Sequence, residues 1–134
     1  MIGIVIVAHA GLAEAFAEAV QHVVGPLPHL AVVSVDSDDG PSARRSEICA
    51  AAVEVDQGDG VVLVTDLFGS TPSNLAINAC QIEGRMDVLY GANLPMLIQL
   101  AKSRSKPRAE AVASALDAGR RYTNVWRAPV VEAI

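Results

Sequence analysis

Aromatic residues are scarce in this sequence: its 134 residues include one tryptophan, two tyrosines and two phenylalanines. The core must therefore be built mainly from valine, leucine, isoleucine and alanine. Cysteine is equally scarce, with Cys49 and Cys80 the two examples. Both lie in apolar, helix-like surroundings, which favours buried free thiols over a disulfide, and their spacing matches no zinc motif.

Long hydrophobic runs and strong positive charge are also absent. No apolar run approaches the roughly 20 residues of a membrane-spanning helix, and no basic stretch precedes the amino-terminal apolar run, as it would in a signal peptide. The net charge of −5 argues against nucleic acid as a partner. We therefore expect a cytoplasmic protein without membrane insertion, and the length predicts a single domain over residues 1–134.

Common nucleotide and metal motifs are missing. The sequence has neither a GxxxxGK[ST] loop nor a GxGxxG turn, which argues against the usual nucleotide-binding loops. Ser70 has no GxSxG context, which argues against a hydrolase. No second histidine lies at ligand spacing from His9, so we expect no metal site and no cofactor.

Short apolar runs rich in β-branched residues alternate with helix-like segments along the chain. The pattern predicts strands over residues 2–8, 30–35, 61–65, 86–90 and 125–131. It predicts helices over residues 12–24, from a Ser42 cap to about residue 57, and over 72–83, 94–101 and 107–122. The alternation indicates βαβ units, and hence an α/β fold with a doubly wound, mainly parallel sheet and helices on both faces.

Two chemically active side chains directly follow predicted strands. His9 follows the strand over residues 2–8, and Asp66 follows the strand over residues 61–65. Ligands of open α/β sheets bind at the carboxyl ends of strands. If these two strands are neighbours, Asp66 can hydrogen-bond one ring nitrogen of His9 and leave the other as a nucleophile. The alternative is a structural histidine and an unrelated turn aspartate.

The turn after Asp66 has the residues of an anion site. Gly69 lets the backbone approach a ligand closely, while Ser70 and Thr71 supply hydroxyl groups. Thr71 and Pro72 are typical of a helix start, whose free amides and dipole attract phosphate. An ordinary capped helix is the alternative. An anion site beside a nucleophilic imidazole predicts a phosphoryl group carried on histidine.

Three segments together resemble one family. In this order, IVIVAHAGLAEAF, VLVTDLFGSTPSNLA and VLYGANLPML are similar to the mannose-family enzyme IIA domains of the bacterial phosphoenolpyruvate-dependent phosphotransferase system. The resemblance implies that His9 is a catalytic residue, which accepts a phosphoryl group from the carrier protein HPr, or its nitrogen-branch counterpart, and passes it to an enzyme IIB. It implies that Asp66 orients His9. The phosphoryl oxygens are then expected against the turn of Phe68, Gly69, Ser70 and Thr71.

The resemblance also implies an architecture. The sheet would have the strand order 2-1-3-4, and a C-terminal antiparallel strand would be exchanged between the subunits of a homodimer. Residues 125–131, with Trp126 as an anchor, are the candidate for that strand, and a tail packed on its own domain is the alternative. The sequence ends at Ile134, so we expect a free-standing enzyme IIA. It would serve sugar transport, by peripheral association with a permease, or a regulatory phosphorelay.

Other functions stay open at this stage. A related possibility is the phosphocarrier subunit of dihydroxyacetone kinase, and a different one is a non-catalytic module that senses a small anion. Asn93 either supports the His9 pocket or caps the next helix. The basic run of Lys102, Arg104, Lys106 and Arg108 is interpreted as a solvated loop.

Overall fold

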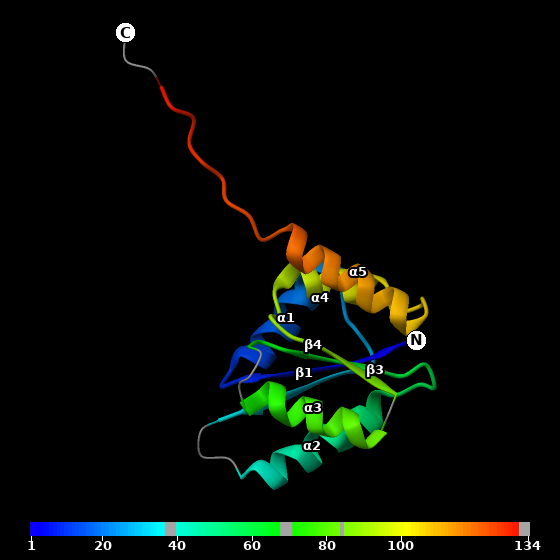
Figure 1. Cartoon of the computed structure of the whole chain (residues 1–134). Coiled ribbons are helices and arrows are strands. Elements are labelled where there is room, and N and C mark those ends of the chain that lie inside the picture. Colours follow the sequence, from blue (N-terminus) through cyan, green and yellow to red (C-terminus); the bar gives the residue numbers. More distant parts are fainter. Residues whose placement is uncertain (37–39, 68–70, 84, 132–134) are drawn as a thin grey trace.

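The computed structural model describes residues 1–36, 40–67, 71–83 and 85–131, and in them strands alternate with helices as the sequence predicts (Figure 1). The elements are β1 (Gly3–His9), α1 (Leu12–Val24), β2 (Leu30–Val35), α2 (Pro41–Val55), β3 (Val61–Thr65), α3 (Thr71–Glu83), β4 (Met86–Leu89), α4 (Leu94–Lys102) and α5 (Arg108–Arg121). None of the helices in the described residues is both long and apolar enough to cross a lipid bilayer.

The four strands form one parallel sheet in the order β2-β1-β3-β4, which confirms the predicted order. Val7 of β1 lies opposite Thr65 of β3, so the two strands end side by side. The chain passes from β1 to β2 on one side, whereas β3 and β4 lie on the other. The space between the ends of β1 and β3 is therefore the switch point, where doubly wound sheets bind ligands.

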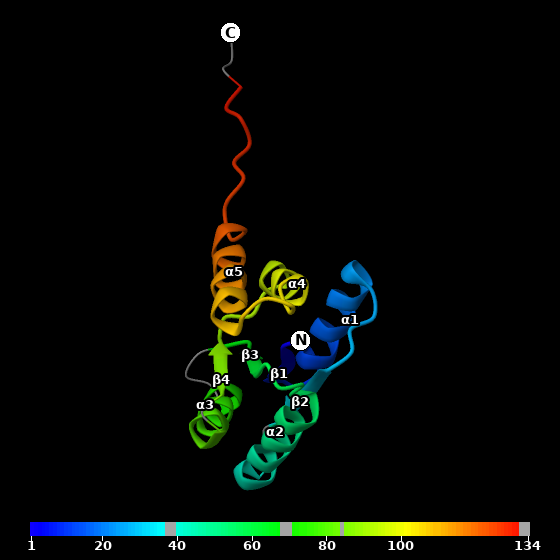
Figure 2. The same cartoon turned by 90° about the vertical axis from the view of Figure 1, so that its right-hand side faces the viewer.

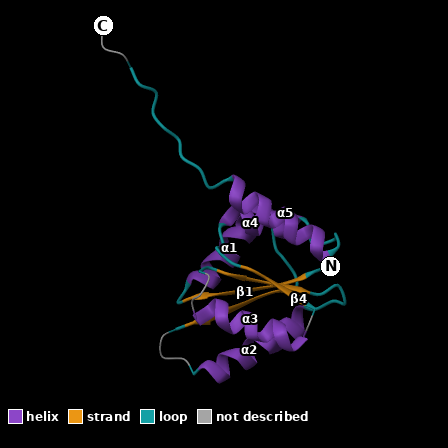
Figure 3. Cartoon of the chain, viewed as in Figure 1, coloured by secondary structure: helices purple, strands orange, loops and turns teal. Residues whose placement is uncertain are grey.

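Helices cover both faces of the sheet (Figures 2 and 3). Helices α1, α4 and α5 lie on one face and α2 and α3 on the other. Alternate residues of β1 serve the two cores: Ile4 and Ile6 pack on the α1 side, while Val5 and Val7 pack toward α2. This pattern explains the unbroken apolar runs, because a strand covered on both faces has no solvent-facing side.

The predicted strand over residues 125–131 is not formed within a single chain. In the described part of a single chain, residues 123–131 have no regular secondary structure and extend away from the body (Figure 1). The physical reason is that a strand needs a partner for its backbone groups, and this segment pairs with no strand of its own chain in the described residues. Trp126 is 82% exposed.

Helix boundaries differ slightly from the prediction. Helix α2 begins at Pro41 with Gly40 as its N-cap, so Ser42 lies inside the helix rather than capping it. Helix α2 ends at Val55, two residues before the predicted end, and α3 already includes Thr71. Proline needs no backbone donor, which suits it to the first helical position.

The interpretation of the basic run as a solvated loop is wrong for Arg104. Its side chain is 4% exposed. It donates from Nε to the Ile2 carbonyl at 2.8 Å and from a terminal nitrogen to the His29 carbonyl at 2.8 Å. Burial lowers the pKa of the Arg104 guanidinium. Arg104 thus joins the amino ends of β1 and β2, and Arg108 forms an ion pair with Asp87 at 2.9 Å.

Candidate functional site

The structure brings His9 and Asp66 together at the switch point. His9 is the last residue of β1, and Asp66 comes directly after β3. The Nδ1 atom of His9 lies 2.7 Å from Oδ2 of Asp66, and the backbone N–H of His9 donates to the same oxygen at 3.2 Å. One carboxylate oxygen therefore holds both the ring and the main chain of His9.

The ring and the carboxylate differ in exposure. The His9 side chain is 48% exposed, whereas that of Asp66 is 12% exposed. Burial of Asp66 by itself would raise the pKa of its carboxyl group, but the hydrogen bonds from the His9 ring and backbone outweigh burial and lower that pKa. Asp66 is consequently ionised at neutral pH.

The ionised carboxylate decides the tautomer of His9. A carboxylate only accepts hydrogen bonds, so the proton of a neutral His9 ring is assigned to Nδ1. The other nitrogen, Nε2, then keeps its lone pair on a ring that is half exposed to solvent. This arrangement can present a nucleophile to a second molecule and can stabilise positive charge on the ring afterwards.

Two buried polar atoms beside the pair have no hydrogen-bond partner among the described residues. They are Oδ1 of Asp66 and Oγ1 of Thr65, the last residue of β3. An unpaired buried polar atom costs roughly 1–3 kcal/mol. These two atoms can therefore form hydrogen bonds in addition to those that Asp66 accepts from His9.

The turn after β1 has an unusual backbone. Ala10 has φ 47°, in the left-handed region that costs an L-residue roughly 1–2 kcal/mol. Its N–H still donates to the Val35 carbonyl at 3.1 Å. Gly11 then caps α1 without a side-chain hydrogen bond. Sequence reasoning missed Ala10, because alanine gives no signal for a left-handed position.

A second contact that sequence reasoning missed fixes the start of α1. The Ser34 hydroxyl lies 2.6 Å and 2.5 Å from the two carboxylate oxygens of Glu14. This hydrogen bond lowers the pKa of Glu14. Ser34 lies in β2 and Glu14 in the first turn of α1, so the contact ties the helix that follows His9 to the neighbouring strand.

The remaining predicted residues are placed only in part. Thr71 is the exposed first residue of α3, the helix that follows Asp66, so its place fits an anion site at this end of the sheet. Phe68, Gly69 and Ser70 lie outside the described residues. Asn93 caps α4 by accepting from the Met96 N–H at 3.0 Å. Its amide also donates to the Gly119 carbonyl at 3.0 Å, so these contacts favour the capping interpretation.

The two cysteines of the sequence are also placed only in part. Cys49 is a free thiol on α2 and is half-buried, and the side chain of Cys80 is not among those that the structure describes. No group of three His, Cys, Asp or Glu residues that could hold a metal ion occurs in the described ranges.

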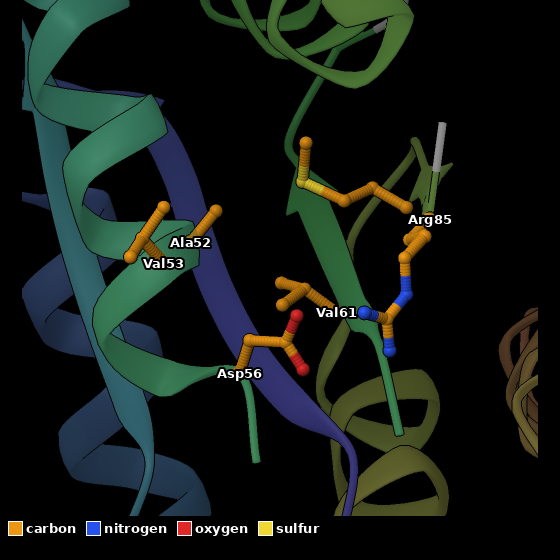
Figure 4. A pocket seen from close by; sticks show the side chains of 6 residues that line it. Ala52, Val53, Asp56, Val61 and Arg85 are labelled. Carbon is orange, nitrogen blue, oxygen red and sulfur yellow. The ribbon is translucent and has the colours of Figure 1, made fainter. Parts of the chain in front are cut away.

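A crevice of about 50 Å³ near the amino ends of β3 and β4 is a poor alternative site (Figure 4). Asp56 and Arg85 line it, but both are already engaged. Asp56 accepts from the N–H groups of Gly58 and Gly60 at 2.8 Å and 3.2 Å, and Arg85 donates to the Gly58 carbonyl at 2.6 Å. The charged groups of Asp56 and Arg85 therefore stabilise the turn at residues 56–60, which argues against a ligand site in this crevice.

Fold and site together define a doubly wound α/β protein with an exposed, carboxylate-held histidine at its switch point. The chain belongs to the EIIA-man family, described as "PTS system fructose IIA component", whose model matches residues 3–116. Membership confirms the resemblance drawn from the three sequence segments. It makes this chain an enzyme IIA component of the phosphotransferase system (PTS), a class of phosphotransferase components.

Individual relatives agree with the family. The chain is 32% identical to the PTS system sorbose-specific EIIA component of Lacticaseibacillus casei, over 73% of this chain and 70% of the relative. It is 25% identical to the mannose-specific EIIAB component of Escherichia coli K12, over 98% of this chain but 41% of that longer protein. The mannose/sorbose specific IIA subunit from Enterococcus faecalis has the same fold, with a TM-score of 0.85, 27% identity and 98% of each chain covered.

Proposed function

We propose that this chain is a phosphohistidine carrier, which accepts a phosphoryl group on Nε2 of His9 from a phosphorylated HPr-type protein and passes it to an enzyme IIB. The observation that carries the proposal is the contact of 2.7 Å between His9 Nδ1 and Asp66 Oδ2. It leaves the lone pair on Nε2 of a ring that is half exposed, so Nε2 is the proposed nucleophile. Family membership supports the same chemistry, and all 134 residues would act as one enzyme IIA domain.

The transfer needs no cofactor, because one phosphorus–nitrogen bond replaces another. The lone pair of His9 Nε2 attacks the phosphorus of the donor's phosphohistidine. The bond from phosphorus to the donor imidazole breaks, and its electron pair leaves with that imidazole. The His9 ring, still protonated on Nδ1, then carries positive charge beside the Asp66 carboxylate, which stabilises it. The same steps in reverse deliver the group to the acceptor.

The phosphoryl oxygens would lie against the turn that follows Asp66. Phe68, Gly69, Ser70 and Thr71 are the proposed phosphoryl-binding residues. The support is the place of Thr71, at the beginning of a helix of 13 residues whose dipole favours an anion at this end. Hydrogen bonds from this turn speed the transfer if they are stronger to the phosphoryl group in the transition state than to the same group on the donor protein.

The family names indicate the partners. The relative from Escherichia coli is an EIIAB component, in which the IIA part is joined to a IIB part, so an enzyme IIB is the proposed acceptor for this chain. Its action would take place in the cytoplasm, with a permease as a peripheral contact where sugar is transported. The relatives carry the names sorbose, fructose and mannose, so no single sugar is proposed.

We also propose that the chain forms a homodimer through its C-terminal segment. Four apolar residues of this segment are 63–90% exposed in the single chain: Val125, Trp126, Val130 and Val131. Such exposure is unfavourable in water, and an edge of the sheet offers unpaired backbone groups to an added strand. A second copy of the chain can satisfy both needs by exchange of residues 125–131.

Phosphorylation in a reconstituted system tests the carrier function. Wild type is incubated with enzyme I, HPr and phosphoenolpyruvate labelled in its phosphoryl group, beside His9→Ala and the control variant His22→Ala. His22 is exposed near the end of α1 and has no role in the proposal. We expect acid-labile, base-stable label on wild type and His22→Ala and none on His9→Ala. Label that persists on His9→Ala would show that another residue is the acceptor.

Native mass spectrometry tests the dimer. We expect a dimer for wild type and a monomer for a chain that ends at Thr123, because the truncated chain lacks the exchanged segment. A monomeric wild type, or a truncated chain that remains dimeric, would refute exchange of the C-terminal strand.

Neither alternative function is favoured by the comparisons. The family model and the sorbose-specific and mannose-specific relatives carry PTS names, and those names mention neither dihydroxyacetone kinase nor an anion sensor. Labelling of His9 followed by transfer to an enzyme IIB would also separate the carrier from a module that only binds anions.

A further inference from the structure

The left-handed residue next to the nucleophile is not glycine, although a glycine follows it immediately. Ala10 has φ 47°, whereas Gly11 has φ −84°. A Cβ atom added at Gly11 would meet nothing within 4 Å. An alanine therefore occupies the position where glycine would relieve backbone strain, and a glycine occupies the position where alanine would fit.

The hydrogen bonds on either side of the turn explain why this conformation is needed. Successive N–H groups of a strand point to opposite edges. The N–H of Ala10 points to β2 and donates to Val35 at 3.1 Å, while the N–H of His9 points to β3 and donates to Asp66 at 3.2 Å. Both backbone N–H groups at the end of β1 are thus held by neighbouring segments, and α1 begins two residues after Ala10, at Leu12.

We propose that Ala10 is a positioning residue for His9, and that its left-handed backbone makes the abrupt turn which lets one oxygen of Asp66 hold both the ring and the N–H of His9. With an ordinary negative φ at residue 10, the chain would leave β1 in another direction. Because β1 is held in the sheet and α1 is held by its buried residues, the backbone torsions of His9 would have to compensate, which would move its N–H or its ring away from Oδ2 of Asp66. The role deepens the proposed carrier function and rests on it.

Substitutions at residue 10 separate the backbone from the side chain. Glycine and asparagine tolerate the left-handed region, whereas a β-branched residue does not. Ala10 is exposed, so none of these side chains meets a packed core. The series is Ala10→Gly, Ala10→Asn and Ala10→Val, with Gly11→Ala as the matched control.

Two readouts are measured on each variant. Nitrogen NMR of the imidazole reports the tautomer of His9, and rapid-quench labelling with phosphorylated HPr reports the rate of phosphoryl acceptance. We expect the Nδ1–H tautomer and wild-type rates in Ala10→Gly, Ala10→Asn and Gly11→Ala. In Ala10→Val we expect mixed tautomers and a rate lowered at least tenfold, with the fold retained by circular dichroism. The tautomer is a readout that a merely structural residue would not change.

The outcomes distinguish the two proposals. A wild-type tautomer and rate in Ala10→Val would overturn the role of Ala10. If Ala10→Val does not fold, Ala10→Gly decides: strain relief predicts a melting temperature at or above that of wild type, and a clearly lower one would overturn the proposal. The tautomers of His9 can follow the expected series although neither wild type nor any variant accepts a phosphoryl group. In that case the positioning role of Ala10 stands and the carrier function fails.

Discussion

Replacing Asp66 by asparagine tests the central physical argument, because it removes the charge and keeps the size of the side chain. Two unit charges 4 Å apart interact by about 4 kcal/mol at an effective dielectric constant of 20. The half-exposed His9 ring retains only part of that energy. We therefore expect Asp66→Asn to lose about 2.7 kcal/mol of transition-state stabilisation, which is roughly 100-fold in rate.

Rapid-quench labelling with phosphorylated HPr at neutral pH measures the loss. The control is Asp117→Asn, which removes an exposed carboxylate that pairs with Arg121 on α5. It should change the rate less than twofold, because this exposed pair on α5 has no part in the proposed transfer. A rate for Asp66→Asn within threefold of wild type, with the fold intact, would refute the orienting and charge-stabilising role of Asp66.

The same substitution predicts a change in acid stability. The pKa of Asp66 is lower in the folded chain than in the unfolded chain, so the unfolded chain binds more protons as pH falls below about 4. The stabilisation from the ionised carboxylate is complete above the unfolded pKa and is lost as pH falls through the folded pKa. Urea unfolding should therefore show a gap between wild type and Asp66→Asn that narrows from pH 6 toward pH 2. A gap independent of pH would contradict this linkage.

Three further substitutions test the packing that supports the site, each by urea unfolding. Gly3→Ala should destabilise by about 1–3 kcal/mol, because its Cβ would lie 2.7 Å from Cγ2 of Val55; an unchanged midpoint would show that α2 shifts freely. Asn93→Ala should cost at least about 1 kcal/mol, since α4 loses its cap and the Gly119 carbonyl loses a donor; a neutral effect would mean that water replaces both bonds. Arg104→Met should cost roughly 1–3 kcal/mol, because the Ile2 carbonyl loses its Arg104 donor and the His29 carbonyl keeps only the Ile4 N–H, and a gain in stability would show that burial of the charge dominates.

Local sequence was sufficient for most of the fold. The apolar runs of β1 and β3 indicated strands covered on both faces, and alternation with helices indicated a parallel sheet. Periodicity could not predict where α2 begins, because Ser42 and Pro41 are both acceptable at a helix start. It also could not say whether residues 125–131 form a strand within one chain, since a pattern typical of a strand does not say which chain supplies its partner.

The sequence by itself determined which residues are the candidates for the chemistry: His9 and Asp66 each follow an apolar run, and this can be read from the order of residues alone. Only the tertiary structure decided that one carboxylate oxygen holds both the ring and the backbone of His9. It alone showed the left-handed turn at Ala10 and the buried Arg104. The reason is physical: these features depend on contacts between segments up to about a hundred residues apart, and neither alanine nor arginine carries a local signal for them.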